Sequence, residues 1–219
     1  MKLSLLRSKA RSILKGKWFS FVGYTILLLI LNTTVPKLLE KLYLYKGNLG
    51  MDTVLSFLYE VLVIGALTLG SNSLYLKITK DEKASVRTIF SFFSNFNSYK
   101  KAIIYNLLMG LYFILWSLLL IIPGIIKSFS YAMSSYILIE EPHLTANQAI
   151  TKSRQMMDGY KWKLFCLYLS FAGWFILSIL TVGIGFLWLI PYYQTSIACF
   201  YNDIKDKYKV TEPNSSDEL

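Results

Sequence analysis

One histidine and two acidic residues lie close together near the middle of the chain and form its best candidate group for metal or acid–base chemistry. Glu140, Glu141 and His143 occur in the stretch EEPHLT. Carboxylate and imidazole groups bind transition metals, but a protein site needs three or four ligands at suitable spacing in the sequence. No further potential ligand lies at a suitable spacing from these three residues. We interpret the stretch as a solvated loop before a helix, and we predict no metal and no cofactor.

The chain lacks the spacing of familiar catalytic motifs. It contains no HExxH pair, no GxSxG turn, no phosphate-binding P-loop and no Rossmann glycine pattern. Serine residues are numerous, but none forms an evident motif with the single histidine. We therefore expect no catalytic residue and a protein that is not an enzyme.

Two charged residues interrupt apolar stretches. Glu60 is the one acidic residue inside such a stretch, and Lys127 lies in another. Ionisable groups inside a membrane cost a few kcal/mol and often mark function. If the stretch starts near Val54, Glu60 lies about 9 Å deep at about 1.5 Å per residue, so headgroup contact is the simplest explanation. We predict a structural ion pair between Glu60 and Lys127 rather than a proton relay.

Hydroxyl and amide side chains gather in alternate apolar stretches. The candidate polar-face residues are Ser128, Tyr131, Ser134 and Ser135 in residues 125–139, and Gln194 and Ser196 in residues 186–201. Small polar groups commonly pack membrane helices together. The alternative is a polar crevice open to the cytoplasm, as a carrier would need. We predict that the two faces meet each other rather than lipid.

The elements that position these residues are predicted to be membrane helices. The chain is 54% hydrophobic and only 16% charged, against about 25% charged in soluble proteins. Several apolar runs approach the roughly 20 residues that cross a bilayer. We expect an all-α, polytopic membrane protein with six transmembrane helices in three hairpins. The spans are about 18–35, ended by Pro36; 54–76; 102–122, stopped by a turn at Pro123-Gly124; 125–139; 164–182; and 186–201.

Residues 1–201 are then a single membrane domain, and residues 202–219 a disordered cytoplasmic tail. With six spans, 19 of the 23 cationic residues fall on one side. Lys and Arg concentrate in cytoplasmic loops, so both termini are predicted to be cytoplasmic. Joining the third and fourth spans into one kinked helix would move the cations of residues 140–163 outside, so the count favours six spans.

Three segments at 2–16, 85–96 and 145–159 are predicted to be cytoplasmic amphipathic helices, one before each hairpin. Thr145 and Gln148 have the spacing of a capping box at a helix start. The first and third segments resemble each other at a constant offset: Lys9, Arg11 and Gly16 match Lys152, Arg154 and Gly159. Arg11 and Arg154 are candidate contacts to anionic lipids of the inner leaflet, because each cation near such a surface contributes about 1 kcal/mol. Docking of a membrane protein partner is one alternative; the simplest interpretation is that these helices lie in the interface and cover the inner ends of the spans.

The net charge of +10 does not indicate nucleic-acid binding. The cations flank apolar stretches instead of forming a separate domain, and lysine outnumbers arginine by 19 to 4. Arginine is the better residue for bidentate phosphate and base recognition. Cys166 and Cys199 both lie in apolar stretches, and we expect no disulfide.

The chain resembles the bacterial integral membrane family catalogued as domain of unknown function 975. The resembling stretches are LKGKW, LLLIIPGIIKSFSYAMSSYIL, SRQMMDGYKWKLF and LSFAGWFILSILTVGIGFLWLIPYYQTSIACFY. The resemblance implies a multi-pass protein of the cytoplasmic membrane of a low-GC Gram-positive bacterium. It implies no activity and no functional residues.

From these observations we expect a non-enzymatic membrane protein that acts through interactions, in envelope maintenance or as an accessory to another membrane complex. The alternative is a small permease or lipid-handling carrier. The amphipathic helices favour the first function and the polar faces favour the second.

Overall fold

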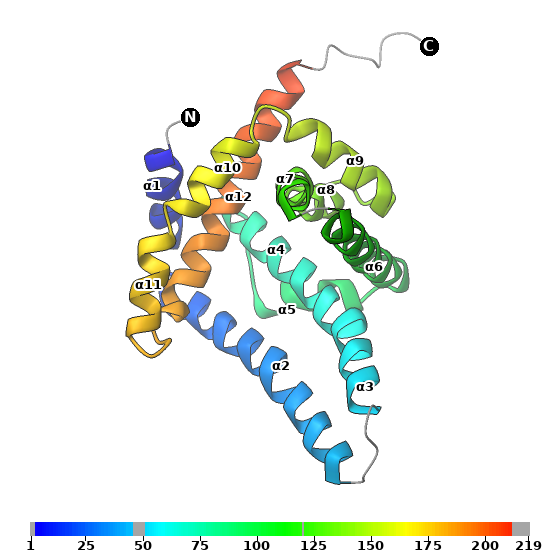
Figure 1. Ribbon diagram of the computed structural model, residues 1–219. Helices are drawn as coiled ribbons and strands as arrows, with labels where there is room; N and C mark the ends of the chain where they lie inside the picture. The colour runs from blue at the N-terminus through cyan, green and yellow to red at the C-terminus, as the bar shows by residue number, and fades with distance from the viewer. Residues whose placement is uncertain (1–2, 46–50, 120, 212–219) are drawn as a thin grey trace.

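A computed structural model describes residues 3–45, 51–119 and 121–211, and this part of the chain is helical and has no strands (Figure 1). The all-α fold class is therefore confirmed. The elements are α1 (Leu3–Leu14), α2 (Trp18–Tyr45), α3 (Met51–Tyr59), the π-helical turn η1 (Glu60–Ile64), α4 (Gly65–Thr79), α5 (Val86–Ile89), the 3-10 turn η2 (Ser91–Phe93), α6 (Phe96–Leu119), α7 (Ile121–Tyr131), α8 (Ser134–Glu140), α9 (Ala146–Met156), α10 (Lys161–Leu169), α11 (Ala172–Leu180) and α12 (Phe186–Thr211).

Four helical segments are long and apolar enough to cross a membrane. They are Trp18–Leu38, Thr53–Thr79, Phe96–Leu118 and Lys161–Leu180, and they coincide with the first, second, third and fifth expected spans. The expected fourth span, residues 125–139, is broken between α7 and α8. The expected sixth span, residues 186–201, is the first part of α12.

Several expected boundaries are wrong. Pro36 does not end the first helix, because α2 continues to Tyr45; membrane helices tolerate proline when freed backbone groups find other partners. Pro123 and Gly124 lie in the first turn of α7 rather than in the loop before it, where proline loses no intrahelical hydrogen bond. The expected disordered tail is helical as far as Thr211, and residues 212–219 lie outside the described part.

The helices form three consecutive units that close into a ring: α1–α4, α5–α8 and α9–α12. The first helix of each unit packs on the last helix of the neighbouring unit, α5 on α4, α9 on α8, and α1 on α12. The second helix of each unit also packs on the neighbouring unit, α6 on α4, α10 on α7, and α2 on α12, although α7 is not the last helix of its unit. The repeat seen in the sequence is therefore a repeat of packing.

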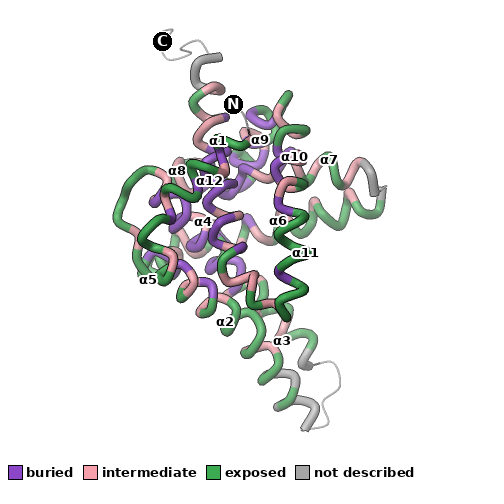
Figure 2. Tube along the Cα trace, turned by 90° about the vertical axis from the view of Figure 1, so that its left-hand side faces the viewer, coloured by how far each residue is buried: buried purple, intermediate pink, exposed green. Residues whose placement is uncertain are grey.

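The three last helices, α4, α8 and α12, form the centre of this ring. Burial is concentrated where they meet α1 and α9, whereas α2, α3 and α11 are largely exposed (Figure 2). The hairpins diverge from this core, and the hairpin of α2 and α3 runs in a different direction from that of α6 and α7 (Figure 2). Their exposed apolar side chains suit contact with hydrocarbon rather than water.

The first and third of these segments form helices, α1 and α9, and their apolar faces pack inside the protein. In α1 the buried residues are Leu6, Ala10 and Leu14. In α9 the Thr145 hydroxyl accepts from the Gln148 amide, and the Gln148 side chain accepts from the Thr145 amide in return, which completes the capping box. Gly16 and Gly159, just beyond these helices, have φ values of +79° and +73°, a conformation that glycine adopts readily.

The expected amphipathic helix at residues 85–96 is wrong. The segment contains one helical turn, α5, followed by the 3-10 turn η2. The Ser94 hydroxyl donates to the Ser91 carbonyl, and Asn95 accepts from the Asn97 amide at the start of α6. Serine and asparagine side chains that bond to nearby backbone compete with a continuous helix.

Candidate functional site

The ends of the three central helices are joined by one carboxylate, which sequence reasoning assigned to a solvated loop. Glu140, the last residue of α8, forms ion pairs with Lys80, just after α4, and with Lys205 of α12. It also accepts a hydrogen bond of 2.7 Å from the Tyr201 hydroxyl of α12. The Glu140 side chain is only 7% exposed. We call Lys80, Glu140, Tyr201 and Lys205 the Glu140 cluster.

The electrostatics of the Glu140 cluster favour the charged carboxylate. Burial alone raises the pKa of Glu140, but hydrogen bonds from Lys205, Lys80 and Tyr201 outweigh it, so the pKa lies below its ordinary value. Three donors from the other two units bind this carboxylate, so Glu140 links all three helical units. Neighbouring Glu141 forms a separate ion pair with Lys152 at 2.8 Å, while His143 is exposed in the following turn.

A second buried contact explains the serine in the SRQMM stretch. Ser153 of α9 is fully buried and reaches the break between α7 and α8. Its hydroxyl donates to the Ser130 carbonyl at 2.9 Å and accepts from the Met133 amide at 3.2 Å. Both backbone groups lie where the α7–α8 path is interrupted, so Ser153 replaces intrahelical hydrogen bonds there.

The polar face of α8 is packed against its neighbours. Ser134 is fully buried, and its hydroxyl lies 2.8 Å from the Tyr105 hydroxyl of α6. Ser135 accepts a hydrogen bond of 3.1 Å from Asn72 of α4. Tyr131, at the end of α7, accepts from the Trp116 indole at 3.2 Å. These hydroxyls therefore hold helices together.

Within the described residues, the two polar faces meet only where Tyr136 of α8 contacts Tyr201 of α12. The rings of Tyr136 and Tyr201 stack with 5.2 Å between centroids. The fully buried Ser196 donates instead within α12, to the Tyr192 carbonyl at 2.8 Å. Gln194 is half-buried on α12, and Ser128 is exposed on α7 and donates to its own helix. In the described part, no hydrogen bond joins Ser134 or Ser135 to Ser196.

The predicted pair of Glu60 and Lys127 is wrong. No ion pair joins them within the described residues; Glu60 is exposed at the start of η1. The Lys127 ammonium lies over the Trp116 ring instead, 4.8 Å from its centroid, a favourable cation–π contact. The π-helical turn at Glu60 also changes the face on which this residue lies, which helical periodicity does not predict.

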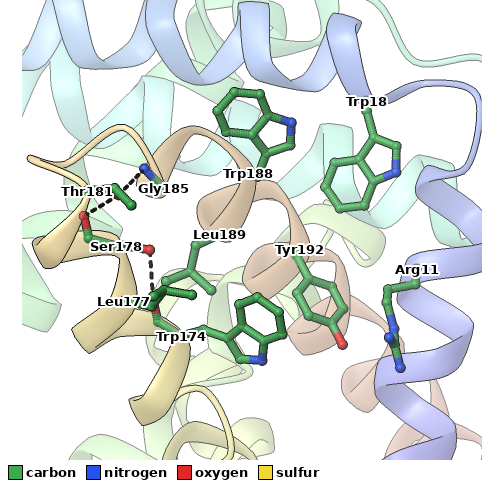
Figure 3. A pocket seen from close by; sticks show the side chains of 10 residues that line it. All are labelled: Arg11, Trp18, Trp174, Leu177, Ser178, Thr181, Gly185, Trp188, Leu189 and Tyr192. Carbon is green, nitrogen blue, oxygen red and sulfur yellow. Dashed lines mark hydrogen bonds between the residues drawn. The ribbon is translucent and has the colours of Figure 1, made fainter.

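A cavity of about 290 Å³ lies where the first and third units meet. Figure 3 shows Arg11 at one end and the turn at Thr181 and Gly185 at the other, with aromatic rings between. The Arg11 guanidinium lies 5.9 Å from the centroid of the Tyr192 ring. The other walls of the cavity come from α2, α11 and α12: Trp18, Trp174, Leu177, Ser178, Trp188 and Leu189.

Arg154 occupies a comparable place where the third and second units meet. It lines a cavity of about 350 Å³ together with Trp116, Tyr131 and Ile150. In both cavities, an exposed arginine of an amphipathic helix lies beside a tyrosine and a tryptophan of the neighbouring unit. The matching offsets of Arg11 and Arg154 in the sequence thus correspond to matching positions in the fold.

Comparison with known proteins places the chain in a family. A family model described as "Protein of unknown function (DUF975)" matches residues 1–127 and 118–208. Neither a curated protein nor a solved structure matches the chain. Because the two matched regions cover nearly the whole chain, the protein belongs to the DUF975 family of proteins of unknown function.

Proposed function

We propose that the protein is a non-enzymatic, multi-pass protein of the bacterial cytoplasmic membrane that acts by binding other membrane components. It would serve envelope maintenance or act as an accessory to another membrane complex. In this proposal the chain crosses six times, with α7–α8 and the first part of α12 completing the second and third hairpins. Both termini are then cytoplasmic, on the side that receives 19 of the 23 cations.

The observation that best supports a binding role is the packed state of the hydroxyl-rich centre. A carrier needs polar groups that face a water-filled path. Here Ser134 and Ser196 are fully buried, Ser135 is 7% exposed, and their hydroxyls bond to Tyr105, Asn72 or backbone. The Glu140 cluster adds an ionic clamp across the cytoplasmic ends of the same helices. This geometry favours a rigid scaffold.

The alternative, a small permease or lipid-handling carrier, is favoured by a different observation, the aromatic cavity at Arg11. Proteoliposome assays separate the two functions. A scaffold should leave the rates of fluorescent-lipid transbilayer movement and solute leak within about twofold of empty vesicles. A large acceleration that Arg11→Gln abolishes would support the carrier and overturn the scaffold.

The proposed topology has its own test. Compartment reporters fused at Gly47, after Glu141 and at the C-terminus should read outside, inside and inside. Gly47 lies outside the described residues, and its place rests on the sequence alone. An outside reading after Glu141 would mean that α7–α8 does not return across the membrane, and the six-span proposal would be wrong.

A further inference from the structure

We infer that the cavity between Arg11 and Gly185 binds one anionic glycerophospholipid of the inner leaflet, with its phosphate at Arg11 and an acyl chain along the tryptophans. The inference goes beyond the proposed function, because it assigns a ligand class to a cavity that a scaffold does not require. It rests on the shape, the lining and the charge of this one cavity.

The far end of the cavity has polar side chains, but their hydrogen-bonding groups are already used. The Ser178 hydroxyl donates to the Trp174 carbonyl at 2.8 Å. The Thr181 hydroxyl donates to the Ser178 carbonyl at 2.9 Å and accepts from the Gly185 amide at 3.0 Å. The three bonds are internal to α11 and its turn (Figure 3). This end therefore offers a ligand mainly carbon surface, which suits an acyl chain.

The middle of the cavity is aromatic and only partly closed. Trp174 and Trp188 are 52% and 46% exposed, and Trp18 of α2 lines the side opposite Trp174 (Figure 3). A volume of about 290 Å³ is at the small end of ligand pockets, roughly 300–1,000 Å³. It accommodates part of one acyl chain, and the remainder stays in the bilayer. Tryptophan also favours the membrane–water interface, where a headgroup begins.

The end of the cavity at Arg11 carries uncompensated positive charge. Arg11 is exposed and forms no ion pair within the described residues; its neighbour there is the Tyr192 ring. Residues 1–17 contain six cations and no acidic residue. A guanidinium donates two parallel hydrogen bonds to a phosphate, which a lysine does not. A phosphate with a net negative headgroup is therefore the complementary ligand.

Quenching by brominated lipids tests the inference in the full-length protein. Three of the five tryptophans line the cavity, so Trp116→Phe together with Trp162→Phe leaves only these reporters. Quenching by dibrominated phosphatidylglycerol and dibrominated phosphatidylcholine is compared in reconstituted vesicles. One cation near an anionic membrane surface contributes about 1 kcal/mol, which corresponds to about a fivefold preference for the anionic lipid over the neutral one. We expect at least that preference for phosphatidylglycerol, and its near loss in Arg11→Gln.

Lys15→Gln is the matched control, because it removes the same charge from an exposed residue outside the cavity. It should change the preference by less than twofold, whereas Arg11→Lys should keep only part of it. Equal losses in Arg11→Gln and Lys15→Gln would show general surface attraction and overturn the site. Equal quenching by dibrominated phosphatidylglycerol and dibrominated phosphatidylcholine in the protein that keeps Arg11 would overturn the site as well.

Discussion

Replacing Glu140 by glutamine tests the clamp that joins the three units. The substitution keeps the size of the side chain and removes its charge. Hydrogen bonds to charged groups contribute about 1.5–3 kcal/mol, and removal of one member of a buried ion pair costs about 3–5 kcal/mol. The Lys80 and Lys205 side chains are 36% and 21% exposed, so water replaces part of the lost interaction. We expect a loss of about 2–3 kcal/mol in the free energy of unfolding.

The assay is thermal unfolding of the purified protein in one mild detergent. For a chain of this length, a loss of 2–3 kcal/mol corresponds to a decrease of about 4–12 °C in the midpoint. Glu141→Gln is the matched control, because the neighbouring residue carries the same charge in a more exposed pair with Lys152. Exposed pairs contribute about 0.2–1 kcal/mol, so its midpoint should fall by less than about 4 °C.

The effect of Glu140→Gln should also depend on pH in one direction. Because the folded-state pKa of Glu140 lies below its ordinary value of 4.5, its stabilisation is fully present above that value. It is lost as the pH falls below 4.5 through the folded pKa. The difference between the unsubstituted protein and Glu140→Gln should therefore be largest near neutral pH and shrink under acid. Equal effects of Glu140→Gln and Glu141→Gln at pH 7 would refute the clamp.

Two further substitutions test the packing. Ser153→Ala leaves the Ser130 carbonyl and the Met133 amide without their partner, so it should lower the free energy of unfolding by about 2–3 kcal/mol in the same thermal assay. The control Ser196→Ala, at an equally buried residue, removes only an intrahelical hydrogen bond and should cost less than about 1 kcal/mol. Similar losses in the two variants would contradict the bridging role of Ser153. Gly70→Ala places a Cβ 1.9 Å from the Ile89 carbonyl oxygen, so α4 and α5 must move apart, which should lower the free energy of unfolding by about 1–3 kcal/mol. The control Gly23→Ala meets nothing within 4 Å and should be neutral or stabilising. A neutral Gly70→Ala would show that α4 and α5 do not approach each other closely at this position.

Local features of the fold could be predicted from the sequence. Helical periodicity indicated that α1 and α9 are amphipathic helices, and the capping box at Thr145 depends only on residues within one turn. Constant offsets indicated that these two helices are equivalent. Their packing partners could not be predicted, because the ring closes through contacts between the first and last units of the chain.

The candidate sites needed the three-dimensional fold for the same reason. Glu140 looked like a loop residue because its partners are far away in the sequence: Lys80 follows α4, and Lys205 lies within α12. The signal that could have indicated the clamp was charge at the ends of the even-numbered spans: lysines follow the second and sixth spans, and Glu140 and Glu141 follow the fourth. Glu60 and Lys127 were paired by depth alone, whereas the π-helical turn and the Trp116 ring determine where they lie.

The packed centre is the central claim for a binding protein, and cysteine labelling tests it most directly. With Cys166 and Cys199 replaced, single cysteines at Ser134, Ser135 and Ser196 are exposed to a membrane-impermeant thiol reagent on the cytoplasmic side. Ser94→Cys, at an exposed position, is the positive control. A packed centre predicts rapid labelling of Ser94→Cys and protection of the other three. Labelling at positions 134 and 135 at a rate close to the control would show a water-filled crevice and contradict the account.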